Sequence, residues 1–115
     1  MDDASSPAPA PAKSAVHKRV FITVDSQPKL PSFVRLHHDE ARGRWVILVP
    51  ERVLVPDETA VEIVRMCDGV KSVRDIIDEL ATRYNADRAL ITVDVLAMLQ
   101  DLADKSFLED KGVKP

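Results

Sequence analysis

Residues 45 to 69 decide the fold, and they read WVILVPERVLVPDETAVEIVRMCDG. Valine and isoleucine are frequent in two short runs, 45–49 and 52–55, and such β-branched residues favour strands. Pro50 lies between the runs and marks a strand boundary, because proline has no backbone N–H to donate to a sheet. An amphipathic helix is predicted at 57–67. A short strand at a sheet edge beside a helix is an arrangement that can bind an extended peptide.

The predicted helix at 57–67 has recognisable ends. Asp57 suits the N-cap, where its side chain can accept a backbone hydrogen bond. Gly69 suits a left-handed residue just after the helix. The inward-facing positions of this helix are predicted to be Ala60, Val61, Val64 and Cys67.

A further strand is predicted upstream, at 33–36. Residues 37–44, which include Gly43, are predicted to form the turn that leads into the strand at 45–49. The strand at 45–49 is continuously apolar, which is typical of a strand covered on both faces.

The second helix is predicted to begin at Ser72 and to end near Asn85. Ser72 and Asp75 form a start that resembles a capping box, with Asp in place of the usual Glu. Apolar side chains then recur with the spacing of one helical face, at Val73, Ile76, Ile77, Leu80 and Tyr84.

A third helix is predicted from a start between Asp87 and Thr92 to about Asp104. Phe107 and Leu108 follow it and are expected to pack back on the core. The apolar stripe of this helix consists of Val95, Leu96, Leu99 and Leu102.

Three short antiparallel strands followed by three helices predict a compact α+β domain of the winged-helix type. The length of 115 residues allows one such domain. We expect this domain at 29–110, a disordered or linker-like tail at 1–28, and a frayed terminus at 111–115. Alternating proline and alanine at Pro7–Pro11 are typical of a semi-extended spacer.

Several of these residues also carry a family resemblance. The most specific are Pro50-Glu51 and Cys67-Asp68-Gly69, and the others are Arg35-Leu36, Asp39, Arg42-Gly43, Asp94-Val95 and Leu99. Through them the stretch from Pro28 to Leu108 resembles the PqqD family, the peptide chaperones of pyrroloquinoline quinone (PQQ) biosynthesis. The resemblance implies a protein that binds the precursor peptide PqqA and presents it to the radical SAM enzyme PqqE. Some members of the family are fused to another enzyme of the pathway, and the tail resembles the linker of such a fusion.

The resemblance also implies where the peptide binds, namely as a fourth strand against the third strand and the third helix. The candidate peptide-binding residues are therefore Arg52, Val53, Leu54 and Val55 on the strand, and Val95, Leu96 and Leu99 on the helix. An edge strand offers unpaired N–H and C=O groups to an extended peptide. The alternative is that Val53, Val55, Val95 and Leu99 are plain core residues, which is the stronger interpretation for Leu99.

Catalytic or metal chemistry is not indicated. His37 and His38 are adjacent, and adjacent strand residues point to opposite faces, so they cannot share one metal ion. Cys67 has no histidine placed to activate it, and Asp68 beside it raises the pKa of a thiol, which favours a buried structural role. We expect no enzyme activity, no cofactor and no metal.

A winged-helix DNA-binding regulator is the alternative function. The third helix would then read DNA, but it and its flanks carry four aspartates against Arg88 and Lys105, and Gln100 is the one uncharged residue there of a type that reads bases. From residue 29 to residue 110 sixteen acidic residues face eleven basic ones, which on average repels a phosphate backbone. No nucleic acid partner is therefore expected.

The cysteine count and the lack of a signal or membrane-spanning segment indicate the cellular compartment. A single cysteine allows no internal disulfide, which fits a reducing compartment. The acidic start leads into no apolar region of a secretory signal, and no apolar run approaches the length of about 20 residues that spans a membrane. We expect a cytoplasmic protein without a membrane partner.

Residues 20–24, VFITV, are β-prone but have no obvious hairpin partner. The connector from 25 to 32 could span about 25 Å, which is long enough for this segment to reach the edge strand at 52–55. Self-pairing there would compete with a bound peptide. The alternative is a disordered extension of the tail.

Overall fold

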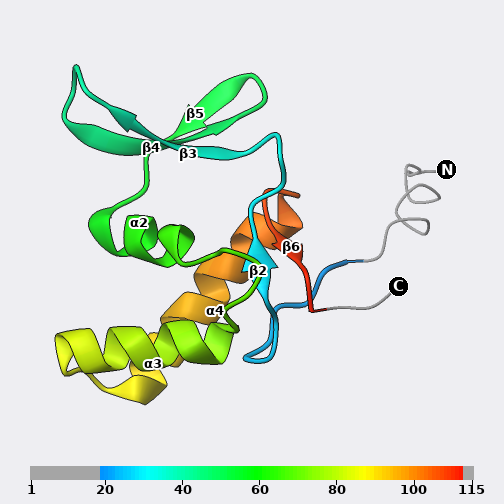
Figure 1. Cartoon of the computed structure of the whole chain (residues 1–115), viewed down its shortest axis with the longest axis vertical. Coiled ribbons are helices and arrows are strands. Elements are labelled where there is room, and N and C mark those ends of the chain that lie inside the picture. The colour runs from blue at the N-terminus through cyan, green and yellow to red at the C-terminus, as the bar shows by residue number, and fades with distance from the viewer. Residues whose placement is uncertain (1–18, 113–115) are drawn as a thin grey trace, which may run out of the picture.

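The structure is a computed structural model that describes residues 19–112. Its elements in chain order are β2 (Pro28–Lys29), β3 (Arg35–Asp39), β4 (Arg44–Val49), β5 (Arg52–Leu54), α2 (Glu58–Arg65), α3 (Val73–Tyr84), α4 (Arg88–Asp104) and β6 (Glu109–Asp110). Strands β3, β4 and β5 form one antiparallel sheet, and the three helices lie on one side of it (Figure 1). The predicted α+β, winged-helix-like order of three antiparallel strands before three helices is confirmed.

Strand β4 is the centre of the three-stranded sheet and pairs with both β3 and β5. Residues directly opposite each other in an antiparallel pair project from the same face, so each row of partners belongs to one face of the sheet. The row formed by Leu36, Ile47 and Leu54 packs on the hydrophobic core. This row therefore marks the inner face of the sheet, which looks toward the helices.

Strand β3 is longer at its end than the sequence predicted, because it extends to Asp39. His37 and His38 pair with Val46 and Trp45 of β4, so they lie in the strand and the predicted turn at 37–44 is wrong at its start. Residues 40–43 make the turn, with Gly43 at a φ of 62°. The ring of Trp45 lies 4.9 Å from the ring of His38, its partner across the two strands beside the turn.

The three helices begin and end close to where their capping residues predict. The Asp57 side chain accepts a hydrogen bond from the backbone N–H of Ala60, and the capping box of Ser72 and Asp75 has both of its hydrogen bonds. Asn85 ends α3 in the left-handed conformation, with a φ of 49°. Across residues 19–112, none of the helices combines the length and apolarity needed to span a bilayer.

The core lies between the inner face of the sheet and the three helices. Leu80 is 2% exposed, and Phe107 and Leu108 pack back on the core as predicted. Side chains from α3 and α4 are the most completely buried, with at most 1% exposure, and they are Val73, Ile76, Ile77, Val95 and Leu99. The helical faces predicted for α3 and α4 are therefore correct, except that Tyr84 at the end of its stripe is half exposed.

A second, two-stranded sheet of β2 and β6 was not predicted. Pro28 pairs with Asp110, and the backbone N–H of Gly69 donates to the carbonyl of Pro28 at 2.8 Å. Gly69 has a φ of 82°, and a Cβ there would lie 3.0 Å from the Cδ of Lys29, so this crossing point requires glycine. The backbone N–H of Lys111 also donates to Gln27, so ordered contacts run one residue past the predicted end of the domain.

Residues 19–24 pack on α4, which overturns both interpretations of the β-prone segment. Ile22 is 8% exposed and belongs to the core. The Gln100 side chain accepts a hydrogen bond from the N–H of Ile22 at 2.9 Å and donates one to the carbonyl of Val20 at 2.8 Å. The segment is thus neither a disordered extension nor a partner of the edge strand, and the predicted tail ends too late. The rest of that tail, residues 1–18, and residues 113–115 at the other end lie outside the described part of the chain.

Candidate functional site

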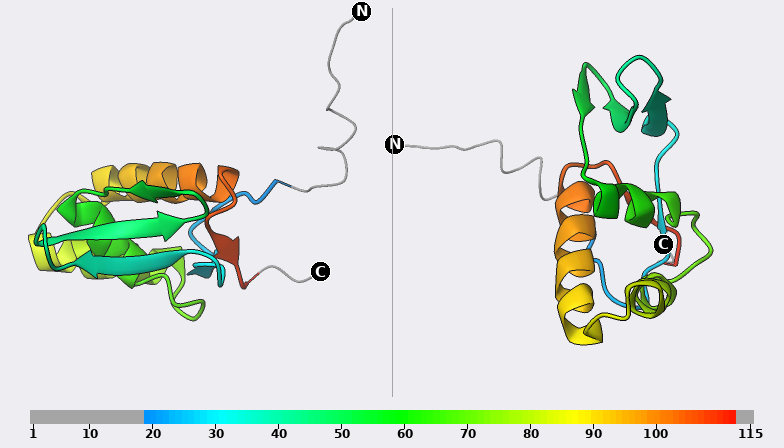
Figure 2. Two further views of the ribbon diagram at one scale, coloured as in Figure 1. Left: turned by 90° about the horizontal axis from the view of Figure 1, so that it is seen from above. Right: turned by 90° about the vertical axis from the view of Figure 1, so that its left-hand side faces the viewer.

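Strand β5 forms an open edge of the three-stranded sheet. It pairs with β4 on one side, and among residues 19–112 no strand pairs with its other side. Seen from above in Figure 2, β5 is the strand nearest to α4, and the free edge of β5 faces the side on which α4 runs. An unpaired edge beside a helix is therefore present, as the sequence predicted.

The pairing register determines which backbone groups of β5 point to the free edge. Pro50 and Glu51 form a two-residue turn between Val49 and Arg52, which pair with each other. Residues that flank such a turn form a hydrogen-bonded pair, and hydrogen-bonded and non-hydrogen-bonded pairs alternate along the strands. The next pair contains Val53, so its N–H and C=O point away from β4 toward the free edge.

The side chains of β5 divide between two faces. Leu54 packs against the core, and the Arg52 guanidinium lies 5.5 Å from the ring of Phe107, so both point toward the helices. Val53 and Val55 are 54% and 57% exposed and project from the opposite face. The candidate strand residues thus offer main-chain groups at the edge and apolar side chains on the outside.

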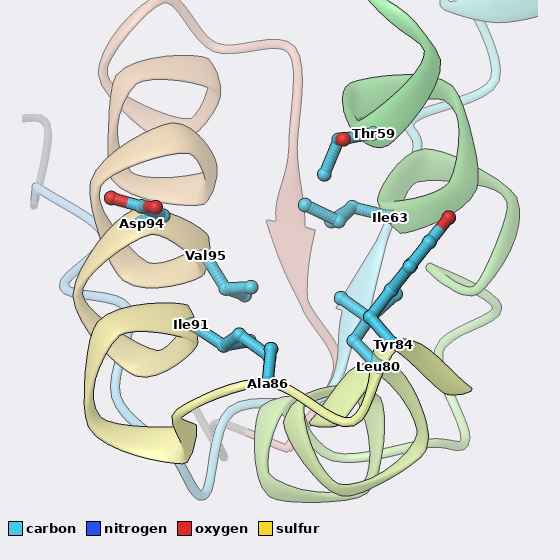
Figure 3. A pocket seen from close by; sticks show the side chains of 8 residues that line it. All are labelled: Thr59, Ile63, Leu80, Tyr84, Ala86, Ile91, Asp94 and Val95. Carbon is cyan, nitrogen blue, oxygen red and sulfur yellow. The ribbon is translucent and has the colours of Figure 1, made fainter. Parts of the chain in front are cut away.

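A pocket of about 190 Å³ opens where β5 leads into α2. Figure 3 shows that its walls come from α2, from α3 with the loop that follows it, and from α4; the lining residues are Thr59, Ile63, Leu80, Tyr84, Ala86, Ile91, Asp94 and Val95. Most of these side chains are apolar. The Tyr84 hydroxyl donates to Glu62 at 2.6 Å, and this hydrogen bond raises the pKa of the tyrosine. The pocket has room for an apolar side chain.

The candidate residues of α4 require correction. Val95 and Leu99 are 1% and 0% exposed, so they support the site from beneath and offer almost no surface to a peptide. Leu96 lies four residues before Gln100 and therefore on the same side of the helix, where Gln100 binds residues 20–22. That side of α4 is already occupied by this chain's own segment.

Apart from Val95, the residues of α4 on the side of the pocket were missed by the sequence analysis. Ile91 and Asp94 line the pocket, and Met98 follows Asp94 by four residues, which places it one turn further along that side. The signal was present in the chain, because the i, i+3 and i+7 spacing from Ile91 describes a stripe beside the buried one. Asp94 interrupts the apolar character of this second stripe, and for that reason the stripe was not identified from the sequence.

Among the described residues, no group of three or more His, Cys, Asp or Glu side chains could hold a metal ion. Cys67 is buried, and its thiol lies 3.3 Å from the carbonyl oxygen of Ile63, to which it donates. Burial, followed by the charge of Asp68, raises the pKa of this thiol to about 12, so it stays protonated at neutral pH. The arrangement can bind main chain and apolar side chains, and it presents no activated nucleophile.

Comparison with known proteins identifies the family. The sequence model of Coenzyme PQQ synthesis protein D (PqqD) matches residues 44–108. The chain belongs to the PqqD family. A PqqA binding protein of Rhodopseudomonas palustris (strain TIE-1) is 60% identical over 93 residues, which cover 81% of this chain and 91% of the relative. The PqqA binding protein of Bradyrhizobium diazoefficiens is 52% identical over 97 residues, which cover 84% and 94%.

A solved structure of the PqqD family supports the same fold. The solution structure of the PqqD truncation of Methylobacterium extorquens PqqCD is 41% identical and matches with a TM-score of 0.66. The match covers 76% of this chain and 94% of that one. That protein represents a functional and stand-alone recognition element for ribosomally synthesized and post-translationally modified peptides.

Proposed function

We propose that this chain is a peptide chaperone that binds the precursor peptide PqqA by strand addition along β5. The observation that carries the proposal is the free edge of β5, with the N–H and C=O of Val53 directed away from β4. The names of the curated relatives, PqqA binding proteins, supply the identity of the peptide. An added strand would give those backbone groups hydrogen-bond partners.

Helix α4 forms the second wall of the proposed site. Peptide side chains alternate between two faces in an added strand, so every second one points toward the helices. Those side chains would meet Met98 and, at the end where β5 leads into α2, the pocket bordered by Ile91 and Asp94. Apolar contacts on this side give specificity, while main-chain hydrogen bonds along β5 fix the register.

The proposed role is positional rather than catalytic. The chain would hold PqqA extended and present it to the radical SAM enzyme PqqE. We propose PqqE as a partner because the PqqD family resemblance implies it. The only cysteine is a buried thiol that stays protonated at neutral pH, and the described residues form no metal cluster that would supply chemistry. A free thiol also fits a reducing compartment, and we therefore propose that the protein acts in the cytoplasm.

The relative from Methylobacterium extorquens, a truncation of PqqCD, also motivates a proposal about architecture. Residues before Arg19, with their proline-alanine spacer, are suited to linking this domain to another enzyme of the pathway in a fused relative.

Calorimetric titration of synthetic PqqA into the full chain tests the proposed function. We expect saturable binding of one peptide per chain, and no binding of a peptide with the same composition in scrambled order. Equal heats from the two peptides would mean that the edge has no sequence-specific partner in PqqA, and the proposed function would be wrong.

DNA binding is not favoured. Asp94, Asp101 and Asp104 are exposed on α4, the helix that would enter a groove, and the relatives are PqqA binding proteins. Carboxylates on a reading helix repel phosphates. Micromolar binding of duplex DNA with a steep salt dependence would reverse this conclusion.

A further inference from the structure

The outer face of the three-stranded sheet is the surface opposite the helices. Figures 1 and 2 show no helix or strand of residues 19–112 lying over it. The pairing register assigns its side chains, because they alternate with the inner row of Leu36, Ile47 and Leu54. The outer-face residues are Arg35, His37 and Asp39 of β3, Arg44, Val46 and Leu48 of β4, and Val53 of β5.

This outer face combines an apolar strip with unpaired positive charge. Val53 is 54% exposed, and Leu48, which pairs with it, is half-buried. Arg35 and Arg44 are exposed, and neither makes an ion pair with another described residue. Asp39 is the carboxylate on this face, and it is bound by Arg42.

The charge of the outer face contrasts with the rest of the domain. On the strands of this face two arginines, Arg35 and Arg44, face one carboxylate, Asp39, and Arg42 of the adjoining turn binds that carboxylate. From residue 57 to residue 110, six basic residues face thirteen acidic ones. The sheet therefore presents a locally basic face on an acidic body, and such a face attracts partners that carry carboxylates.

We propose that the outer face docks the enzyme that modifies the bound peptide, through an apolar patch on that enzyme ringed by carboxylates. The inference rests on the proposed function. A peptide added to β5 continues the sheet, so every second side chain of the peptide projects from the outer face beside Val53. The outer face is thus the surface on which an enzyme contacts the chaperone and the presented peptide at the same time.

The charge of the outer face favours the enzyme over a second copy of this chain or a nucleic acid as the binding partner. A second copy of this chain would place two basic outer faces against each other in a symmetric contact, and like charges placed together oppose association. A nucleic acid would gain few phosphate contacts from two arginines and would meet the acidic helices beyond them. A surface with carboxylates around an apolar centre matches both features of the outer face.

The test uses the full chain with the double substitution Arg35→Glu and Arg44→Glu, and PqqE with bound synthetic PqqA as the probe. The control is Arg74→Glu with Arg88→Glu, which makes the same change in net charge. Both control residues are exposed on the helices and pair with single carboxylates, Asp25 and Asp78, so their loss changes stability little.

We expect the outer-face variant to bind PqqA with unchanged affinity and PqqE at least about tenfold more weakly, while the control binds PqqE within about twofold of the unchanged chain. Added salt should weaken PqqE binding of the unchanged chain more than that of the outer-face variant. Equal PqqE affinity in the two variants would overturn the inference. So would loss of PqqA binding in the outer-face variant, or self-association of the unchanged chain that this variant abolishes. Failure of the unchanged chain to bind PqqA is a separate result, and it would count against the proposed function.

Discussion

Two β-prone segments of this chain differ in how their backbones are paired and how far their side chains are buried. Residues 20–24 and 52–55 are both short and rich in valine. Residues 20–24 lie on α4, with Ile22 in the core and two backbone groups bound by Gln100. Residues 52–54 pair with β4 on one side and with no strand of residues 19–112 on the other, and Val53 and Val55 are each exposed by more than half. The difference teaches that strand propensity does not decide where a segment goes, whereas the partners available to its backbone do.

The helix side chains explain the difference. Gln100 supplies a donor and an acceptor on one side of α4, so residues 20–22 satisfy backbone groups there without a second strand. Further along, the N–H groups of Val73 and Arg74 at the start of α3 donate to Ser26 and Val24. The side of α4 with Met98 offers no comparable amide, and the free edge of β5 pairs with no strand of residues 19–112.

The largest expected effect is on stability, where substitutions in residues 20–24 should cost far more than substitutions in residues 52–55. Ile22→Ala should lower the free energy of unfolding by about 2–5 kcal/mol, because it leaves a cavity in the core. Val53→Ala should change it by at most about 0.5 kcal/mol, because Val53 is mostly exposed. Urea denaturation of both variants measures this. Similar midpoints would mean that residues 20–24 are not packed as described.

The next largest effect is on peptide affinity, which should depend on the backbone of residues 52–55. Val53→Pro removes the N–H that points to the free edge, without removing a hydrogen bond to β4, so PqqA binding should weaken by about 1–3 kcal/mol. Val53→Ala keeps the N–H and is the matched control for the lost side chain. Affinity measured by fluorescence anisotropy should fall in the proline variant alone. A proline variant that stays folded and binds as tightly as the control would exclude strand addition at this residue.

A smaller effect is expected at Gln100. Gln100→Ala removes the hydrogen bonds to Val20 and Ile22 and should cost about 1–2 kcal/mol of stability, while PqqA affinity stays the same. Gln100→Glu keeps the acceptor for the N–H of Ile22 but places a carboxylate beside the carbonyl of Val20 and the carboxylate of Asp104, so it should cost at least as much. Thermal unfolding with parallel peptide titrations measures both quantities. A change in PqqA affinity in the alanine variant would show that residues 19–24 and the peptide share a surface.

The smallest effect concerns pH and the start of the packed segment. The Arg19 guanidinium donates to Asp104 at 2.8 Å, and this bond, followed by one from Gln100, holds the pKa of the Asp104 carboxyl below its usual value. The contribution of this pair to stability is therefore fully present above the ordinary aspartate pKa of about 3.9 and is lost as the pH falls through the lowered value. The Arg19 side-chain NMR signals should follow that loss. In Asp104→Asn they should show no such pH dependence, and an identical titration in both proteins would mean that another group controls the contact.

Much of the fold could be predicted because its signals are local. The capping residues Asp57 and Ser72, the proline at the strand boundary and the helical stripes each act within a few residues, and each element formed where they indicated. The β2–β6 sheet could not be predicted in the same way. Its strands have two residues each and lie about 80 residues apart in the chain, so no periodicity marks them.

The candidate site was only half predictable for a related reason. The strand 52–55 is marked by its own composition and by the turn before it. The wall on α4 depends on which side of the helix other segments cover, and this is decided by the distant residues 19–24. The apolar stripe of Val95 and Leu99 therefore identified the core side of α4, where Val95 also lines the pocket, but not Ile91 and Asp94 on the adjoining side.

Backbone amide NMR during titration with PqqA tests the central claim most directly. Strand addition predicts that the largest shifts fall at Val53 and Val55 and along α4 near Asp94 and Met98, while the amide of Ile22, held by Gln100, moves little. Shifts that cluster instead on the exposed face of α3, around Asp78, with unchanged β5 amides would contradict the account.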